Sequence, residues 1–217
     1  MFTGIILATG TIASLTPKGG DVSVRIRCPD LQPQRFAEGE SICVSGVCLT
    51  ALDIDTDGFS ADVSRETLDV TAFSSWEAGT VVNLEPSLAI GDRLGGHLVT
   101  GHTDGVATLT SRYADARSVR LQFQVAPDLA RYIAKKGSVC VDGTSLTVNE
   151  AGADTFDVNI IPHTADQTTL GALAVGDAVN IEVDLLARYA ERLLRGGEAA
   201  DDGAVNSKVL GSLGFAR

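Results

Sequence analysis

The chain contains the stretch Ser41-Ile-Cys-Val-Ser-Gly-Val-Cys-Leu-Thr50, and 97 positions later a similar one, Ser138-Val-Cys-Val-Asp-Gly-Thr-Ser-Leu-Thr147. Six of these ten positions are identical. The same ungapped offset aligns further regions of the chain: Thr3-Gly4 with Thr100-Gly101, Phe59 with Phe156, and residues 79–85 with 176–182. A period of 97 residues is too long for a solenoid repeat. The sequence therefore predicts two tandem copies of one domain.

Each copy has the pattern of short strands joined by tight turns. Apolar side chains occupy every second position of residues 21–28, and residues 119–125 repeat that alternation. Such alternation is typical of strands that bury one face. Ser45-Gly46 and Asp142-Gly143 lie between apolar segments, where hairpin turns are expected. We therefore predict an all-β fold with two closed or nearly closed barrels.

Helices are predicted at few places, and a last short one is expected in the final dozen residues. Residues 34–36 and 128–133 fit single short helices, the second directly after Pro127. After the second copy, apolar residues recur at helical spacing and two glycines follow: Leu186, Tyr189, Ala190, Leu193, Leu194, Gly196 and Gly197. This pattern predicts an amphipathic helix that ends at the glycines, followed by an acidic linker at 198–203. Its apolar face has two candidate partners, the chain's own barrels and a neighbouring subunit.

The composition excludes several classes of protein. Apolar residues make up 44% of the 217 residues, which is too many for a disordered chain. The net charge of −11 repels phosphate backbones, so no nucleic-acid partner is expected. No apolar stretch reaches the ~18 residues of a membrane span, and the apolar N-terminus lacks the basic leader of a secretory signal. The four cysteines are too sparse for a disulfide scaffold, which favours a cytoplasmic location.

The two copies differ at a few aligned positions that carry chemistry. At the offset of 97, the differing pairs are Phe2 and Val99, Ile5 and His102, Gly39 and Lys136, Cys48 and Ser145, and Glu66 and His163. Two equivalent folds offer two equivalent pockets, and unequal residues give those pockets distinct tasks. The sequence therefore predicts two related but unequal sites.

Six motifs, in their joint order and spacing, resemble the riboflavin synthase family of the alpha-chain type. They are Met1-Phe-Thr-Gly-Ile5, Gly46-Val-Cys-Leu-Thr50, Glu66-Thr-Leu68, Gly95-Gly-His-Leu-Val-Thr-Gly-His102, Asp142-Gly-Thr-Ser-Leu-Thr-Val148 and Thr168-Thr-Leu-Gly171. The resemblance extends from Met1 to about Asp184. Two positions depart from it, because His163 replaces an expected glutamate and Ser45 replaces a common asparagine.

The resemblance implies a fold, a reaction and an assembly. The family has two similar Greek-key barrels followed by a helix, here expected at residues 1–97, 98–184 and 185–217, and it forms homotrimers. Its reaction moves a four-carbon unit between two molecules of 6,7-dimethyl-8-ribityllumazine, giving riboflavin and 5-amino-6-ribitylaminouracil without cofactor or metal. The site lies between the N-terminal barrel of one subunit and the C-terminal barrel of its neighbour. Lumazine synthase is a further candidate partner.

The family's substrate-binding segments map onto both copies. In the first copy they correspond to Gly4, Ile5, Ile6, Cys48, Leu49, Thr50, Asp62, Val63, Ser64, Arg65, Glu66 and Thr67. In the second copy they correspond to Gly101, His102, Thr103, Lys136, Ser145, Leu146, Thr147, Asn159, Ile160, Ile161, Pro162, His163, Thr164 and Asp184. Backbone amides and hydroxyls in these segments suit a flat heterocycle with ring nitrogens and carbonyls.

Five residues are the candidate catalytic groups. The chemistry needs a proton taken from the C7 methyl of one lumazine and a nucleophile added at C7 of the other. His102 is the candidate for proton transfer, because an imidazole titrates near neutrality. Cys48 or an activated water is the candidate nucleophile, and Ser145 and Thr147 would hold or relay protons. Phe2 is expected to cover the substrate face or the pocket mouth.

Each of these roles has a plainer alternative. His102 could only orient its loop, Cys48 could be a small core residue, and Asp184 could be a surface carboxylate rather than an acceptor in the site. His97 and His102 lack a third ligand in an obvious place, so we expect no zinc site. Among functions, the alternative is a lumazine-binding optical protein of luminous bacteria, which binds one chromophore as a monomer. A flavin-reductase-type barrel is disfavoured, because no nicotinamide-binding domain follows.

Overall fold

The computed structural model describes residues 1–196, and the first copy forms a six-stranded antiparallel sheet. Its strands are β1 (Ala8–Lys18), β2 (Asp21–Arg27), β3 (Ser41–Val44), β4 (Val47–Thr50), β5 (Gly58–Val63) and β6 (Val81–Pro86). They are ordered β4-β3-β6-β1-β2-β5, so β6 returns to lie between β3 and β1, as in a Greek key. The helix α1 (Arg65–Val70) and three 3₁₀ helices, η1 (Pro29–Leu31), η2 (Pro33–Arg35) and η3 (Ala72–Ser75), complete this copy.

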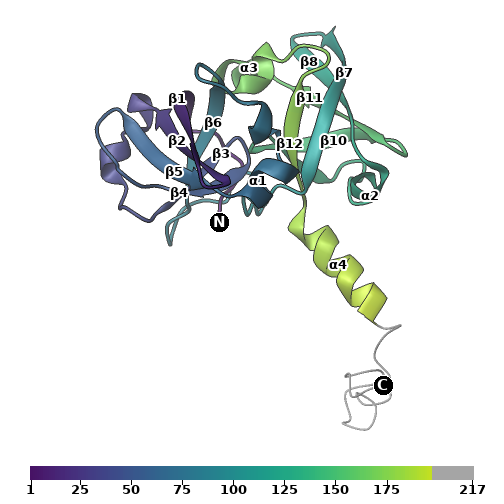
Figure 1. Cartoon of the computed structure of the whole chain (residues 1–217). Coiled ribbons are helices and arrows are strands. Elements are labelled where there is room, and N and C mark those ends of the chain that lie inside the picture. Colours follow the sequence, from purple (N-terminus) through teal and green to yellow (C-terminus); the bar gives the residue numbers. More distant parts are fainter. Residues whose placement is uncertain (197–217) are drawn as a thin grey trace. The chain divides into compact units, whose positions relative to one another are not determined.

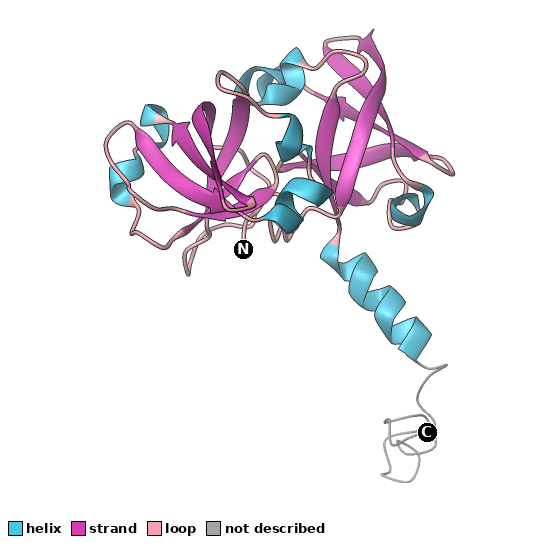
Figure 2. Cartoon of the chain, viewed as in Figure 1, coloured by secondary structure: helices cyan, strands magenta, loops and turns pink. Residues whose placement is uncertain are grey.

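The second copy repeats this order and closes fully. It contains β7 (Gly105–Asp115), β8 (Ser118–Gln124), β9 (Ser138–Val141), β10 (Thr144–Ala151), β11 (Thr155–Ile160) and β12 (Ala178–Val183), with α2 (Pro127–Ala130), α3 (Pro162–Gln167) and η4 (Thr169–Ala172). The barrel closes where β10 pairs with β11. Figure 1 shows the strands of the first copy in purple to blue and those of the second in teal to green. Figure 2 shows that both copies consist mainly of strands, with only short helices. The prediction of two tandem β-barrels is confirmed.

The first barrel is only nearly closed, because β4 is half as long as its counterpart β10. Asp53 has a left-handed φ of 46°, which ends the extended chain after Leu52. Leu52 and Ser60 still exchange two backbone hydrogen bonds of 2.8 and 2.7 Å, so one bridge joins the edges. Each barrel has its own apolar core, with Phe59 in the first and its counterpart Phe156 in the second.

The predicted short helices are present but reduced. At residues 34–36 the chain forms only the 3₁₀ helix Pro33–Arg35, because Phe36 already has an extended backbone with φ −87° and ψ 150°. At residues 128–133 the α-helix ends at Ala130, and tighter bonds from Tyr132 N to Leu129 O and from Ile133 N to Ala130 O continue the turn. Both differences follow from the local backbone conformation, which the spacing of apolar residues does not encode.

The C-terminal helix α4 (Leu185–Gly196) is amphipathic, as predicted. Its large apolar side chains Leu186, Tyr189, Leu193 and Leu194 are exposed within the single chain. An i,i+4 ion pair of 2.7 Å joins Arg195 to Glu191 on this helix. From Leu186 on, the described part of α4 belongs to a unit of its own, and the predicted linker at 198–203 and the short helix expected in the final dozen residues lie outside the described residues. None of the helices within residues 1–196 is long and apolar enough to cross a membrane.

Two equivalent buried asparagines join the barrels. The side-chain amide of Asn83 donates to Asp142 O at 2.8 Å, and that of Asn180 donates to Ser45 O at 2.8 Å. Each side-chain carbonyl also accepts a backbone N–H, from Thr169 for Asn83 and from Ala72 for Asn180. The hairpin turn of each barrel is therefore held by the opposite barrel through pseudo-symmetric contacts.

Asp142 is the point where this junction departs from symmetry. Its carboxylate accepts the Asn180 N–H at 2.8 Å, whereas Ser45 Oγ accepts the Asn83 N–H at 3.0 Å. Burial raises the pKa of Asp142 to about 7. The folded protein therefore binds this proton more tightly than the unfolded chain, in which the pKa is near 3.8. Stability from this group is greatest below the unfolded pKa and is lost as the pH rises through the folded pKa.

We expect Asp142→Asn to flatten this pH dependence. The amide oxygen still accepts from Asn180, asparagine tolerates the left-handed φ of 45°, and the titration is removed. In urea unfolding between about pH 4 and pH 7, wild-type stability should fall by a few kcal/mol and the variant's by clearly less. Ser45→Asn, at the equivalent turn, should leave the pH dependence unchanged. An Asp142→Asn variant with the wild-type slope would contradict this expectation.

Candidate functional site

Two buried glutamates hold the loops that the sequence places in the binding sites. Glu85 Oε1 accepts Thr3 N at 2.7 Å and Thr3 Oγ1 at 2.6 Å, and Oε2 accepts Gly4 N at 2.9 Å. Glu182 repeats this set in the second copy with Thr100 N, Thr100 Oγ1 and Gly101 N at 2.6, 2.8 and 2.8 Å. Burial raises the pKa of both carboxyl groups, and these hydrogen bonds oppose the shift. Each glutamate thus fixes the start of one predicted binding segment.

The held loops cross to the opposite barrel. Ser145 N donates to Gly4 O at 2.8 Å, and Cys48 N donates to Gly101 O at 2.8 Å. A Cβ at Gly4 would lie 2.6 Å from the Ser145 Cβ, and Gly4 has a φ of +77°. Only glycine therefore permits this approach, and Gly101 repeats the geometry against Cys48. The structure therefore brings Gly4 against Ser145 and Gly101 against Cys48.

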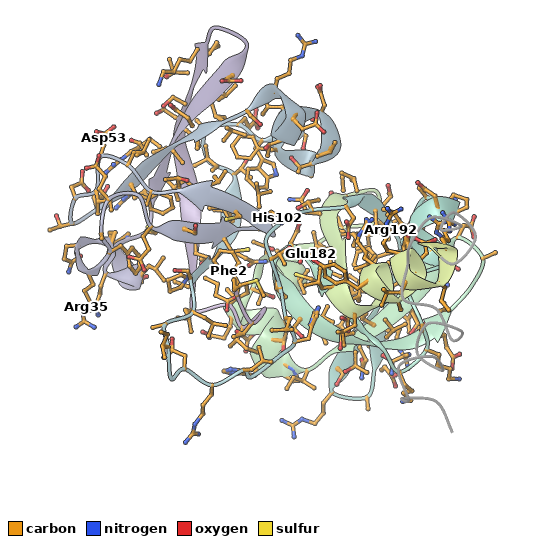
Figure 3. All side chains as sticks on the ribbon, turned by 90° about the horizontal axis from the view of Figure 1, so that it is seen from below. Phe2, Arg35, Asp53, His102, Glu182 and Arg192 are labelled. Carbon is orange, nitrogen blue, oxygen red and sulfur yellow. The ribbon has the colours of Figure 1, made fainter. Side chains whose placement is uncertain are left out.

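Phe2 lies between these two contacts and is fully buried. It exchanges backbone hydrogen bonds of 2.7 and 3.1 Å with Val99, its counterpart in the second copy. Its ring belongs to a buried cluster with Val99, Cys43 and Cys140, against which Cys48 packs. Within the single chain Phe2 is therefore a core side chain, and its role in covering a substrate stays a prediction. Figure 3 shows Phe2, His102 and Glu182 where the barrels meet, whereas Arg35 and Asp53 lie on the far side of the first barrel.

His97 lies beside Ser145, and the comparison of the two copies could not single it out. Its Nδ1 lies 2.7 Å from Ser145 Oγ, with either atom able to donate according to the tautomer. Burial lowers the pKa of His97, which favours the neutral imidazole, and the charge of Asp184 opposes the shift. An offset of 97 would align His97 with a position before Met1, so this residue has no counterpart. A Cβ at Gly96 would lie 2.2 Å from Thr3 O and 2.7 Å from Ser145 Cβ, so the position before His97 requires glycine.

Four further candidate residues are exposed: His102, Thr50, Thr147 and Lys136. His102 is exposed at the end of the loop that Glu182 holds, and its N–H donates to Thr100 Oγ1 at 3.3 Å. Thr50 and Thr147 are exposed at equivalent positions of β4 and β10. Lys136 has a left-handed φ of 68° at the position where the first copy has Gly39. A non-glycine residue in this conformation is strained, which is common at functional sites.

The remaining segments lie where β5 and β11 lead into α1 and α3. Asp62 pairs with Lys18 at 2.7 Å, and Ser64 caps the helix by accepting Thr67 N at 3.2 Å. In the second copy, Asn159 Oδ1 is buried without a hydrogen-bond partner. An unpaired buried carbonyl is costly, so this atom is available for a ligand donor. The side chains of Leu49, Val63 and Ile160 are buried in the barrel cores and can serve a site only through their backbone.

A pocket of about 460 Å³ lies beside the first held loop and is lined by Thr3, Ile5, Leu7, Glu85, Pro86, Ser87, Leu88, Asp92, Arg93 and Gly95. This volume is in the range of small-molecule sites.

Within the described residues, no cluster of histidine, cysteine, aspartate or glutamate could hold a metal ion. The site can therefore offer imidazole, thiol and hydroxyl groups together with ordered backbone amides, which suits proton transfer and addition chemistry.

The family model described as "Lumazine binding domain" matches the chain twice, at residues 3–87 and 100–184. The chain belongs to the lumazine-binding domain family. The two matched ranges start and end 97 residues apart, which is the offset of the repeat. The resemblance seen in the motifs is thereby confirmed.

The chain is also similar over most of its length to riboflavin synthases. The chain is 45% identical to the riboflavin synthase of Brucella abortus over 198 residues, covering 89% of this chain and 98% of the relative. It is 44% identical to that of Photobacterium phosphoreum over 194 residues, covering 89% of each. It is 36% identical to that of Bacillus subtilis over 216 residues, covering 99% of this chain and all of the relative. This lumazine-binding chain is therefore also a member of the riboflavin synthase family.

Solved structures of LumP are similar as well. LumP complexed with 6,7-dimethyl-8-(1'-D-ribityl) lumazine matches with a TM-score of 0.76 and 26% identity, covering 84% of this chain and 99% of LumP. LumP complexed with riboflavin matches with a TM-score of 0.78 and 27% identity over the same shares. The two-barrel fold is thus shared with a protein whose solved structures hold a lumazine or riboflavin.

We expect Glu182→Gln and Glu85→Gln to loosen different loops. Glutamine keeps one acceptor but turns a donor toward a backbone N–H, which should lower the free energy of unfolding by about 1–3 kcal/mol. Amide exchange should accelerate at Thr100 and Gly101 in Glu182→Gln, and at Thr3 and Gly4 in Glu85→Gln. Each variant is the control for the other. Equal acceleration of both loops in either variant would contradict the assignment of one glutamate to each loop.

Proposed function

We propose that this protein converts two molecules of 6,7-dimethyl-8-ribityllumazine into riboflavin and 5-amino-6-ribitylaminouracil by moving a four-carbon unit from one lumazine to the other. The observation that carries the proposal is that both copies keep the same held loop and strand, yet differ in side chains. A reaction that consumes two copies of one substrate needs two similar sites, and it needs them unequal because one substrate donates and the other accepts. The 36–45% identity to riboflavin synthases supports the same reaction.

The rate advantage of such a site comes from proximity. Holding both rings in place replaces a bimolecular encounter with a local one, which can contribute ~7–11 kcal/mol in well-oriented cases. Residues 4–6 and 101–103 offer backbone groups for the heterocycles, and the unpaired Asn159 carbonyl offers an acceptor in the second copy. Lys136 offers a cation there. These groups need no metal or nucleotide.

The polar side chains divide into two sets, one around Cys48 and one around Ser145. His102, next to Cys48 through the Gly101 contact, is the candidate to take the proton from a C7 methyl group. Cys48 or an activated water is the candidate to add at C7 of the second lumazine. His97, as a neutral imidazole, can exchange a proton with Ser145 Oγ, and Thr147 on the same strand can extend this relay. Phe2 would act by packing the loop segments together rather than by touching an open pocket.

We also propose that the working form is a homotrimer in the cytoplasm. The exposed apolar side chains of α4 need a cover, and a second copy of the chain is the partner that the family resemblance favours. The complete site would then lie between the first barrel of one subunit and the second barrel of another. The four cysteines are all free, as expected of a protein in a reducing compartment.

The second candidate function is binding without catalysis, favoured by the likeness to LumP complexes with lumazine and riboflavin. A non-catalytic protein needs only one occupied site and no unequal reactive side chains. The presence of His102, Cys48 and the His97–Ser145 pair in this chain supports the enzyme over the binding protein.

The decisive experiment is incubation of the purified protein with 6,7-dimethyl-8-ribityllumazine, with chelator present and no nucleotide added. We expect riboflavin and 5-amino-6-ribitylaminouracil in equal amounts, measured by absorbance and chromatography. Stoichiometric binding of the lumazine without product would instead indicate the non-catalytic function.

His102→Gln should slow turnover far more than it weakens binding. Removing a general acid–base group typically costs 10²–10⁴-fold in rate, whereas the backbone contacts of the loop remain. Single-turnover kinetics and fluorescence titration with the lumazine would separate the two effects. Unchanged turnover would remove His102 from the proton-transfer step.

The oligomeric state can be measured by light scattering on the full chain and on a chain that ends at Asp184. We expect a trimer for the full chain and a weaker assembly for the shorter one, because α4 then cannot bury its apolar residues. A truncated protein that remains trimeric at equal concentration would show that α4 does not hold the assembly.

A further inference from the structure

Cys43 and Cys48 lie directly opposite each other on the hairpin β3–β4. The next pair, Val44 and Val47, flanks the turn. Cys48 N donates to Gly101 O in the other barrel and not to Cys43, so the two cysteines occupy a non-hydrogen-bonded pair of the ladder. Facing residues of such a pair have Cα atoms about 4.5 Å apart with both side chains on one face. That spacing falls at the short end of the range that a disulfide bridges.

The two thiols differ in access. Cys43 is buried with Phe2, Val99 and Cys140, whereas Cys48 packs against this cluster and is partly exposed. Burial also raises the pKa of Cys43 well above that of a free thiol. Cys48 is therefore the thiol that a dissolved oxidant reaches first, and Cys43 is its nearest covalent partner.

The second barrel has the same hairpin without the pair. Cys140 faces Ser145 at the equivalent positions of β9 and β10, and Ser145 N donates to Gly4 O as Cys48 N does to Gly101 O. The fold therefore does not require a thiol opposite the buried cysteine. The second thiol is a property of the first copy alone.

We propose that the β3–β4 hairpin is a site of reversible oxidation, where a peroxide converts Cys43 and Cys48 into a disulfide. The Cys48 thiolate attacks one peroxide oxygen, the O–O bond breaks, and the leaving hydroxide takes a proton to become water. The Cys43 sulfur then attacks the resulting sulfenic acid, the S–S bond forms, and the S–O bond breaks to release a second water with the Cys43 proton. Two thiols lose two electrons and one hydrogen peroxide gains them.

Oxidation would withdraw the Cys48 thiol from the reactive centre. This consequence rests on the proposed function, because Cys48 lies in a proposed binding segment and contacts Gly101 beside His102. The disulfide formed in the hairpin would leave both barrels folded, since the register of β3 and β4 already places the two residues opposite each other. Turnover would therefore be lost on oxidation and restored by a dithiol reductant.

Peptide mapping tests the proposal directly. The folded full-length protein is treated with hydrogen peroxide, free thiols are alkylated under denaturing conditions, and trypsin is added. Cleavage at lysine and arginine places Cys28 in peptide 28–35, Cys43 and Cys48 together in 36–65, and Cys140 in 137–188. We expect peptide 36–65 to be two hydrogen atoms lighter and not alkylated, while the other two peptides remain alkylated.

Matched variants sharpen the test. Cys140→Ala should keep the lighter peptide, whereas Cys43→Ala should lose it and show an oxidised Cys48 alone. Full alkylation of peptide 36–65 after peroxide, a cross-link to peptide 137–188, or a wild-type Cys48 oxidised while Cys43 is alkylated would each overturn the proposal. The mass readout does not depend on turnover, so failure of the proposed reaction in untreated protein is a separate result.

Discussion

The contact on which the site depends is a buried carboxylate that accepts three hydrogen bonds from one short loop. Burying a carboxylate is costly unless its oxygens are well paired. Glu85 and Glu182 are paired with two backbone N–H groups and a threonine hydroxyl each, and their raised pKa values record the burial that remains uncompensated. These hydrogen bonds hold the loop that begins at Thr3 in the first copy and at Thr100 in the second. Gly4 and Gly101 can then pack directly against Ser145 and Cys48 of the opposite barrel, where a side chain would not fit.

This frame is built from backbone atoms and from residues that are the same in both copies. The glutamates, the asparagines at the barrel junction, the threonines and the glycines all recur at the offset of 97. The side chains at positions 5 and 102, or 48 and 145, take no part in holding the frame. Substitution at those positions therefore changes the chemistry of one site without disturbing the geometry of the other, which is how one ancestral pocket can become two unequal ones.

Much of this could be read from the sequence, because a repeat reveals itself by comparison within the chain. The offset identified both barrels, the hairpin turns and the paired segments, and it contained Glu85 and Glu182 within an aligned stretch. It did not reveal that these two carboxylates hold the loops, since their partners lie 82 positions away along the chain. His97 was missed because it has no counterpart in the first copy. The burial of Phe2 and the open edge after Asp53 depend on packing and on one backbone angle, which periodicity does not encode.

The two hairpins also show how the side chain at one position can differ while its backbone contact is kept. Cys43 and Cys140 both belong to the buried cluster around Phe2, where each packs as a small apolar side chain. Their partners across the ladder contribute a backbone N–H to the frame, so the side chain at that position was free to become a thiol in one barrel and a hydroxyl in the other. The hydroxyl lies beside His97 and gains a proton-exchange partner, whereas the thiol lies opposite a second thiol. In the proposed reaction and the proposed oxidation, this one difference gives the two sites different acid–base and redox chemistry, while the backbone contact that positions them is unchanged.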